Sequence, residues 1–184
     1  AGWVKGGDGI REKEGVRLAF TNSTTAGNHL REQAQQFIQQ TFAEIGAEMT
    51  IHNLPPAVMW GDYWMLSQYD STIVGIAFLT GPDPDTADYF SSKSISAKGG
   101  AGQNTFQWEN EDVDRLLAEG AKIFVPEERK VPYLELQELA REELPFLPMF
   151  QYTVLPGTKT GIEGLVPNVT VRGDSWNVGC WGGV

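Results

Sequence analysis

Three aspartates lie within six positions of the stretch "TGPDPDTADYF" (80–90), which directly follows the apolar run "STIVGIAFL" (71–79). Carboxylates so closely spaced could ligate a metal ion, form a catalytic pair, cap a turn or border a binding cleft. Asp-Pro pairs favour turns, so a capping role for Asp85 or Asp88 is the simplest alternative to a chemical role.

The spacing does not favour metal binding or catalysis. Asp83 and Asp85 fit the first ligand positions of an EF-hand loop, but the sixth position is not glycine, and Ser94 replaces the glutamate needed at the twelfth. Only His29 and His52 could serve as a histidine base, and no nucleophile, zinc or phosphate-binding motif is present. A glycosidase needs two carboxylates that face each other across a substrate, and carboxylates that are neighbours in one loop seldom do so. The sequence therefore predicts no catalytic residue, no metal ligand and no cofactor. A hydrolase of oligopeptides or glycans that uses Asp83 or Asp85 is the alternative.

Composition excludes further classes of protein. The 184-residue chain has a formal net charge of −10 and a pI of about 4.6, so it would repel a nucleic-acid backbone. No apolar stretch approaches the roughly 20 residues of a membrane helix, and the single Cys180 cannot form an internal disulfide. The opening "AGWVKGGDGI" is typical of the interior of a longer protein. We therefore expect residues 1–184 to be a single lobe and a fragment.

The order of patterns along the chain predicts an α/β fold. Strands are expected at 16–22, 48–54 and 70–79, and the last is apolar on both faces, as in the middle of a covered sheet. A helix over 28–45 and a second one beginning at "PPAVMW" separate the strands, which gives a β-α-β-α-β order with parallel strands. The first helix has an apolar stripe at steps of three and four, made of Ala34, Phe37, Ile38, Thr41, Phe42 and Ile45.

The second half is predicted to be mainly helical. Asn110 is the expected N-cap of one helix, and Pro126 the expected first residue of another, which Pro132 either delays or kinks. The stretch "FLPMFQYTVL" (146–155) is expected to be a strand that Pro148 confines to an edge of a sheet. The predicted architecture is thus a parallel-sheet lobe with additional C-terminal helices and an edge strand.

Three loops of this fold should share one edge of the sheet. "STTAGN" (23–28), "NLPP" (53–56) and "TGPDPD" (80–85) each follow a strand, and ligands bind beyond the carboxyl ends of parallel strands. The first loop also leads into a helix N-terminus, where free backbone N–H groups favour an anionic or carbonyl group. The polar side chains of the first and third loops are therefore expected ligand contacts: Thr24, Thr25, Asn28, Asp83 and Asp85.

Five blocks of the sequence resemble a known family. They are "GDGIREKEGVRLAF", "TTAGN" with "AQQFIQQTFAEIGAEMTI", "YDSTIVGIAFLTGPDPD" with "YFSS", "GQNTFQWENEDVDRLL" and "PEERKVPYLELQELAREELPFLPMF". In this order they are similar to the bacterial extracellular solute-binding proteins of family 5, the dipeptide, oligopeptide and nickel-type receptors of ABC importers. The resemblance runs from Gly2 to about Trp176 and covers only the C-terminal lobe of the family.

The resemblance implies a lobe of the type II periplasmic-binding-protein kind and further ligand contacts. In peptide-binding relatives, an aromatic residue that matches Phe78 lies along the ligand. Asn104 and Trp108 fall in a second segment that resembles a cleft border, although a core position suits Trp108 equally well. Dipeptide-type members hold the amino group of the ligand with an aspartate where this sequence has Thr80. This departure argues against recognition of a free N-terminus, unless the loop turns inward and Asp83 substitutes.

The function implied by the resemblance is binding without catalysis. The chain would belong to a substrate-binding component of an ABC importer, in which two lobes close on an extended solute such as a peptide and then dock on permease subunits in the membrane. It would need the missing N-terminal lobe and would bind no nucleic acid. It would act in the periplasm or another extracytoplasmic place. Whether the full-length protein carries a membrane anchor is left open. A module that only mediates contacts is a further open interpretation.

Overall fold

The computed structural model describes residues 2–76, 83–153, 157–168 and 173–183. The chain divides into two compact units, here called unit 1 (residues 1–75 with 96–99) and unit 2 (residues 76–95 with 100–184). Each unit has its own buried residues, and each is described on its own.

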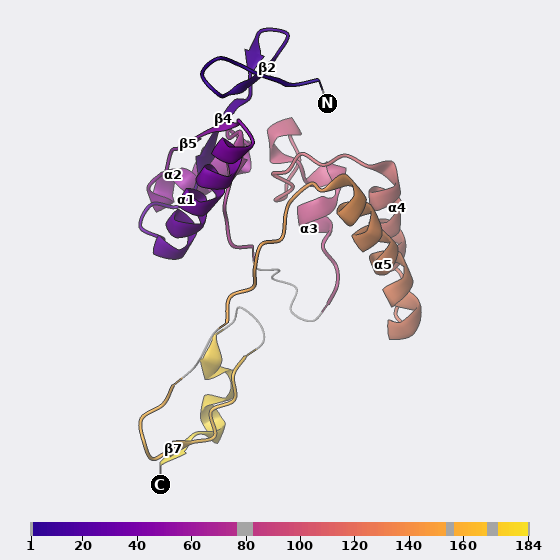
Figure 1. Ribbon diagram of the computed structural model, residues 1–184. Helices are drawn as coiled ribbons and strands as arrows, with labels where there is room; N and C mark the ends of the chain where they lie inside the picture. Colours follow the sequence, from indigo (N-terminus) through magenta and orange to yellow (C-terminus); the bar gives the residue numbers. More distant parts are fainter. Residues whose placement is uncertain (1, 77–82, 154–156, 169–172, 184) are drawn as a thin grey trace. The chain divides into compact units, whose positions relative to one another are not determined.

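A small parallel sheet forms the centre of unit 1 (Figure 1). Its strand order is β5-β4-β6, and both pairings are parallel. Helix α1 connects β4 to β5, and a short helical stretch that includes α2 connects β5 to β6. The bounds are β4 (Ala19–Ser23), α1 (His29–Glu44), β5 (Glu48–Ile51), α2 (Pro56–Val58) and β6 (Ser71–Thr72). The predicted β-α-β-α-β order with parallel strands is confirmed for the described residues.

Strand β4, and not the predicted 70–79 strand, lies in the middle of the described sheet. The Asn22 C=O accepts a hydrogen bond from the N–H of His52 on one side at 2.9 Å, and its side-chain amide donates to Ser71 Oγ on the other at 2.8 Å. Strand β6 pairs with β4 alone and therefore lies at an edge of the described sheet. The prediction of a middle strand at 70–79 is wrong in this respect.

Helix α1 buries a different face from the predicted apolar stripe. Phe37 is 71% exposed and Ile45 is 53% exposed, whereas Gln35 is fully buried. The cause is the polar end of the neighbouring strand, because Gln35 Nε2 donates to Asn22 Oδ1 at 2.8 Å. A buried amide oxygen needs a donor, so the helix presents its glutamine there. The stripe prediction is therefore wrong at Phe37, Thr41 and Ile45, which are exposed.

The first residues of unit 1 form an antiparallel sheet, and the predicted strand at 16–22 is divided between β3 of this sheet and β4 of the parallel sheet. The order of the antiparallel sheet is β1-β2-β3, and it is joined to the end of α1 because Arg11 Nε donates to the Ile45 C=O at 2.6 Å. Gly46, which follows the C-cap residue Ile45 of α1, has a φ of +80°, and a Cβ there would lie 2.9 Å from the Gly9 C=O. Only glycine allows both the positive φ and this close approach to the Gly9 C=O. The bounds are β1 (Val4–Lys5), β2 (Arg11–Lys13) and β3 (Val16–Arg17).

Helices dominate unit 2. Helices α4 and α5 pack side by side, and α3 contacts α4 (Figure 1). Their bounds are α3 (Ala87–Phe90), α4 (Glu111–Gly120) and α5 (Pro126–Glu143). The buried core between them is made of Tyr89, Phe90, Trp108, Val113, Leu116, Leu117, Tyr133 and Leu136.

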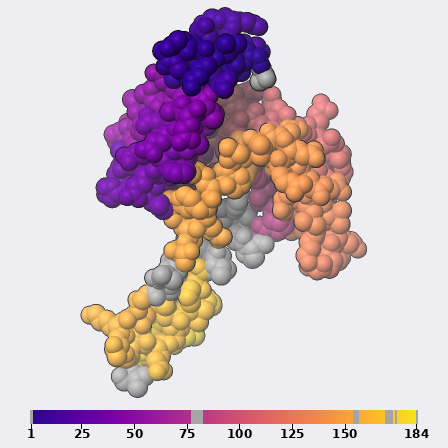
Figure 2. All heavy atoms as spheres, in the orientation of Figure 1, coloured from indigo at the N-terminus to yellow at the C-terminus, as the bar shows by residue number. Residues whose placement is uncertain are grey.

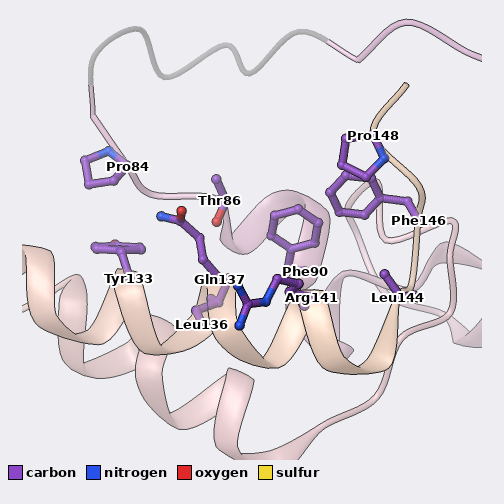
Figure 3. Close-up of a pocket in the computed structure, with 11 residues that line it drawn as sticks. Pro84, Thr86, Phe90, Tyr133, Leu136, Gln137, Arg141, Leu144, Phe146 and Pro148 are labelled. Atoms are coloured by element: carbon purple, nitrogen blue, oxygen red, sulfur yellow. The ribbon is translucent and has the colours of Figure 1, made fainter. Parts of the chain in front are cut away.

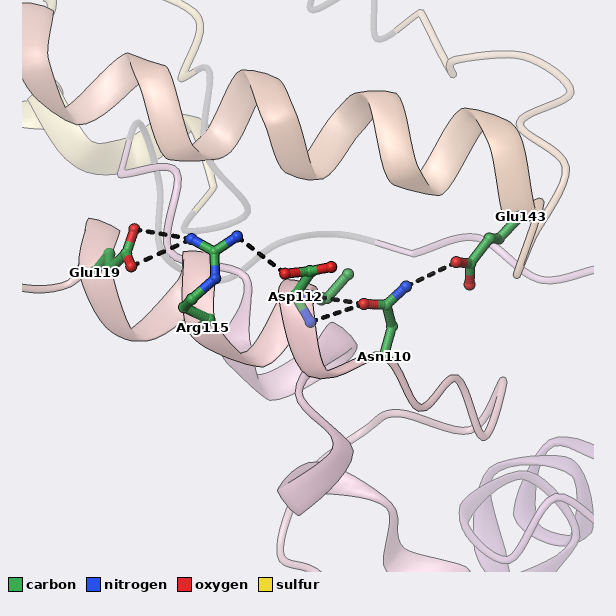
Figure 4. Close-up of polar contacts among 6 residues, drawn as sticks. Asn110, Asp112, Arg115, Glu119 and Glu143 are labelled. Carbon is green, nitrogen blue, oxygen red and sulfur yellow. Dashed lines mark hydrogen bonds and ion pairs between the residues drawn. The ribbon is translucent and has the colours of Figure 1, made fainter.

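The start of α4 agrees with the sequence. Asn110 Oδ1 accepts hydrogen bonds from the N–H groups of Asp112 at 2.9 Å and Val113 at 3.2 Å (Figure 4). Its Nδ2 also donates to Glu143 Oε1 at 2.7 Å, so the cap of α4 is joined to the last residue of α5. On the outer face, Arg115 forms ion pairs with Asp112 and Glu119 (Figure 4). The N-cap prediction for Asn110 is confirmed.

Two predictions for the end of the chain are corrected. Helix α5 begins at Pro126 and continues through Pro132, so Pro132 does not delay its start. The predicted edge strand at 146–155 does not form within the described residues 146–153, and those at 146–151 have no hydrogen-bonded backbone neighbour there. Further along, β7 (Ile162–Glu163) and β8 (Gly182–Gly183) pair antiparallel.

The contact between α4 and α5 generates a stability prediction. Leu116 is 2% exposed between the two helices, so Leu116→Ala should lower the free energy of unfolding by about 2–5 kcal/mol through lost burial and a cavity. Leu134 on α5 is 56% exposed, and Leu134→Ala should change it by less than about 0.5 kcal/mol. Urea denaturation followed by circular dichroism measures both. Equal effects would contradict the described packing.

Candidate functional site

Two of the three predicted loops meet at the carboxyl edge of the sheet in unit 1. The N–H of Thr24 donates to Asn53 Oδ1 at 3.1 Å, and the N–H of Leu54 donates to the Thr24 C=O at 3.0 Å. The N–H of Ala26 donates to the Leu54 C=O at 2.8 Å, which extends the pairing beyond the strands. The loops after β4 and β5 therefore form one continuous surface, here called the ledge (residues 24–28 and 53–54), at the edge where the parallel-sheet rule predicts ligand contacts.

The two threonines of this ledge have different surroundings. Thr24 is fully buried, and its hydroxyl donates to the Ile73 C=O at 2.6 Å, so it holds the chain that follows β6. The Thr25 side chain is partly exposed, but its Oγ1 is buried and has no hydrogen-bond partner among the described residues. A buried hydroxyl without a partner is costly. Thr25 is thus the ledge residue with unused hydrogen-bonding capacity.

Two side chains at the start of α1 already bind backbone N–H groups there. Asn28 Oδ1 accepts from the N–H of Arg31 at 3.2 Å, and Glu32 Oε1 accepts from the N–H of Gly27 at 2.8 Å. The Glu32 carboxylate also supplies the negative charge that a helix N-terminus favours. This arrangement weakens the expectation of an anionic ligand group at this end of the helix.

The aspartates of the third loop hold a turn in unit 2. Asp83 Oδ1 accepts from the N–H of Asp85 at 2.8 Å, and Asp85 Oδ1 accepts from the N–H of Ala87 at 3.1 Å. These are the turn contacts that Asp-Pro pairs favour. The capping interpretation is confirmed for Asp85, whereas the two neighbouring predicted residues, Phe78 and Thr80, lie outside the described residues.

Asp83 also forms an ion pair with α5. Arg129 Nη1 and Nη2 contact its two carboxylate oxygens at 2.9 and 3.0 Å, and the guanidinium lies 5.7 Å from the ring centre of Tyr133. The N–H of Asp85, together with Arg129, lowers the pKa of Asp83 below its usual value. Sequence reasoning missed Arg129, because 46 residues separate it from Asp83 and no local signal connects them.

Asn104 and Trp108 have structural contacts within unit 2. Asn104 is fully buried, and its Nδ2 donates to the C=O groups of Ser91 at 3.0 Å and Trp108 at 2.8 Å. Trp108 is 7% exposed, stands edge-to-face against Phe90, and its Nε1 donates to Glu143 Oε2 at 2.6 Å. A core role is therefore shown for both residues, and their role as ligand contacts stays a prediction.

A groove along α5 was not predicted from the sequence. It has a volume of about 470 Å³, and mainly apolar side chains point into it (Figure 3). Pro84 and Phe90 line one side, α5 lines the floor, and Phe146 and Pro148 line the end (Figure 3). Within the described residues, no group of three or more His, Cys, Asp or Glu could hold a metal ion, and no helix is long and apolar enough to cross a membrane.

The Asp83–Arg129 ion pair generates a pH prediction. The folded pKa of Asp83 lies below the unfolded value of about 3.9, so its stabilising contribution is present above that pH and is lost as the pH falls through the folded pKa. Asp83→Asn should therefore lower the urea midpoint at neutral pH, and the difference from the unsubstituted chain should vanish in strong acid. The exposed Asp62, which has no ion pair in the described structure, provides the control Asp62→Asn. A difference for Asp83→Asn that persists in strong acid would contradict the ion pair.

Comparison with known proteins relates most of the chain to peptide-binding proteins. The oligopeptide-binding protein AppA of Bacillus subtilis is 27% identical over 154 residues, which cover 79% of this chain and 26% of that protein. Di/tripeptide-binding protein 4 of Pseudomonas aeruginosa is 26% identical over 138 residues, which cover 73% of this chain and 25% of that protein. No protein-family model matches the chain.

Solved structures agree with the sequence relatives. AppA in complex with a nonapeptide matches 100% of this chain and 35% of that chain, with a TM-score of 0.77 and 22% identity. The oligopeptide-binding protein of Thermus thermophilus, complexed with a pentapeptide, matches 78% of this chain and 26% of that chain, with a TM-score of 0.65 and 32% identity. These relatives are named for binding and not for catalysis, which agrees with the prediction of a non-enzymatic protein. The chain is a homologue of the family 5 extracellular solute-binding proteins, and it spans about a quarter to a third of their length.

Proposed function

We propose that this chain is part of a substrate-binding component of an ABC importer, and that it forms one wall of an inter-lobe cleft. The observation that carries this proposal is the similarity of nearly the whole chain to proteins named for binding oligopeptides. The described parallel sheet and helices match part of such a protein, which supports one lobe of the type II periplasmic-binding-protein kind. Residues beyond this chain would supply the other wall, since the chain spans only 35% of the AppA structure.

The ledge in unit 1 is the proposed solute contact. Thr25 has a buried hydroxyl oxygen with no partner in the described structure, and backbone pairing fixes the loop that holds it. A rigid loop with unused hydrogen-bonding capacity suits the amide groups of an extended peptide. Asn28 lies on the same loop, although its side chain caps α1. An extended peptide is therefore the proposed class of solute.

The ion pair of Asp83 bears on how the solute's amino group is recognised. Both carboxylate oxygens contact Arg129, so binding a ligand ammonium there would require this pair to be broken or shared. Asp83 and Asp85 instead fix the turn that follows residue 82. We infer that Asp83 does not replace the aspartate that dipeptide-type members have at position 80, and that a free N-terminus is not the main recognition feature.

The proposed mechanism is closure around the solute. Two walls that meet on a peptide remove it from water and pair its amide groups, and the closed form then docks on permease subunits in the membrane. A periplasmic or other extracytoplasmic place of action is part of the same proposal. A hydrolase that uses Asp83 or Asp85 is not favoured, because turn and ion-pair contacts engage both carboxylates.

An isolated wall should bind weakly, which allows a direct test. One wall leaves water on the other side of the peptide, while the peptide still loses its translational and rotational freedom. We expect nonapeptides to bind the 184-residue chain with a Kd on the order of millimolar, or about −4 kcal/mol. Titration of the ¹⁵N-labelled chain with a nonapeptide pool should shift the amide signals of residues 24–28.

A matched pair of variants tests whether the ledge contacts the solute. Thr25→Val removes the unpartnered hydroxyl and should weaken binding by about two- to tenfold, as expected for one hydrogen bond. Thr41→Val makes the same change on the exposed face of α1 and should leave binding unchanged. Binding by the isolated chain at micromolar Kd or tighter, or signal shifts that avoid residues 24–28, would contradict the proposal.

A further inference from the structure

The groove along α5 has no acidic side chain in its described lining, although the chain has a net charge of −10. Its floor is one face of α5 and of the turn that ends it, made of Tyr133, Leu136, Gln137, Ala140, Arg141 and Leu144. Another face of α5 carries Glu135, Glu138 and Glu142, which line a separate hollow against α4. Helical spacing thus keeps these carboxylates out of the groove. The Arg141 guanidinium is the one charged group in the described lining.

Three polar side chains of the lining lack a partner. Thr86, Gln137 and Arg141 line the groove (Figure 3), and within the described structure none of their side chains makes a hydrogen bond or an ion pair. All three can donate hydrogen bonds, and the guanidinium is always charged. An anionic acceptor therefore suits the groove. The simplest alternative is that Arg141, in the last turn of α5, only complements the negative end of the helix.

The walls of the groove favour an aromatic ring. The rings of Phe90 and Phe146 are nearly parallel, with an interplanar angle of 8° and 5.7 Å between their centres, and Tyr133 lines the other end (Figure 3). The volume of about 470 Å³ is typical of small-ligand sites. Leu144 is 53% exposed, and the orange stretch of chain after α5 lies at the surface in Figure 2, so a ligand can enter from solvent.

We propose that this groove is a binding site for a small aromatic carboxylate. The ring of the ligand lies against Phe90 and Phe146, and its carboxylate pairs with Arg141. A cationic ligand would meet only the positive charge of Arg141, and a second copy of the chain would bring a further net charge of −10. The site lies within unit 2 and uses no residue of the ledge, so it goes beyond the proposed peptide contact.

A matched pair of ligands tests the charge. We choose 4-biphenylacetate and its neutral analogue 4-biphenylacetamide, titrated into the ¹⁵N-labelled 184-residue chain. The acid should shift the amide signals of residues 86, 90, 137 and 141 saturably. A Kd on the order of 0.1–1 mM is expected for a ligand of about 16 non-hydrogen atoms. The amide should bind at least about fivefold more weakly, because it forms no charge-assisted pair with Arg141.

Two pairs of variants separate the contributions of charge and shape. Arg141→Gln should weaken binding of the acid at least about fivefold and of the amide less than about twofold. Lys130→Gln removes a positive charge from α5 outside the groove and should change neither. Ala140→Leu narrows the groove without changing its charge and should weaken both ligands at least about fivefold, because it fills the space that the ring needs. Ala118→Leu, on the exposed side of α4, is its control.

Several results would overturn the proposal. They are the absence of saturable shifts at residues 86, 90, 137 and 141, equal affinity for acid and amide, and equal effects of Arg141→Gln and Lys130→Gln. If Arg141→Gln lowers the melting temperature but leaves the affinity unchanged, Arg141 serves only the helix end. Shifts of these signals with protein concentration, but not with ligand, would assign the groove to a second copy. The nonapeptide shifts at residues 24–28 are measured separately, so failure of this site and failure of the proposed function are distinguishable.

Discussion

Buried polar groups must find hydrogen-bond partners, and at the end of β4 this constraint organises unit 1. Asn22, Ser23 and Thr24 are 6%, 0% and 0% exposed. Asn22 binds Gln35 of α1, while Thr24 binds the loop after β5 through its N–H and the chain after β6 through its hydroxyl. Asn22 and Thr24 thus fix a helix, a loop and the chain after β6. Apolar residues would fill the same space, but they would not specify these partners.

Local hydrogen bonding, and not burial, answers the question raised by the clustered aspartates. Asp83 and Asp85 accept backbone N–H groups of their own turn, and Asp83 also binds Arg129. Nearby, Asp114 accepts hydrogen bonds from the Ser91 hydroxyl and the Ser92 N–H. In unit 2 these carboxylates shape loops. In the proposed receptor they would hold the cleft border in place, and the peptide would be recognised by other groups.

Features set by neighbours in sequence could be predicted, and those set by distant partners could not. Asn28 and Asn110 accept N–H groups two or three residues ahead, so both helix starts are visible in the sequence. The parallel-sheet rule also placed the Thr24 loop beside the Asn53 loop. In contrast, the exposure of Phe37 depends on the partner that Gln35 finds on another strand. No pattern within one helix reveals it.

Distance along the chain likewise explains what the sequence could not show of the candidate site. The Arg129–Asp83 pair spans 46 residues, and the hydrogen bond that Asn104 donates to the Ser91 C=O spans 13. The strand pattern at 146–151 is strong, yet a strand forms only when a neighbour completes its ladder. This segment therefore has a strand-like sequence without a strand in the described structure.

The central claim is that this chain is one wall of a peptide-binding cleft completed by residues beyond it. The most direct measurement is calorimetric titration of a chimera in which this chain replaces the matched third of AppA, with a nonapeptide as ligand. The account predicts binding at least about a hundredfold tighter than that of the isolated chain, because both walls then enclose the peptide. A chimera that unfolds cooperatively but binds nonapeptides no better than the isolated chain would contradict it.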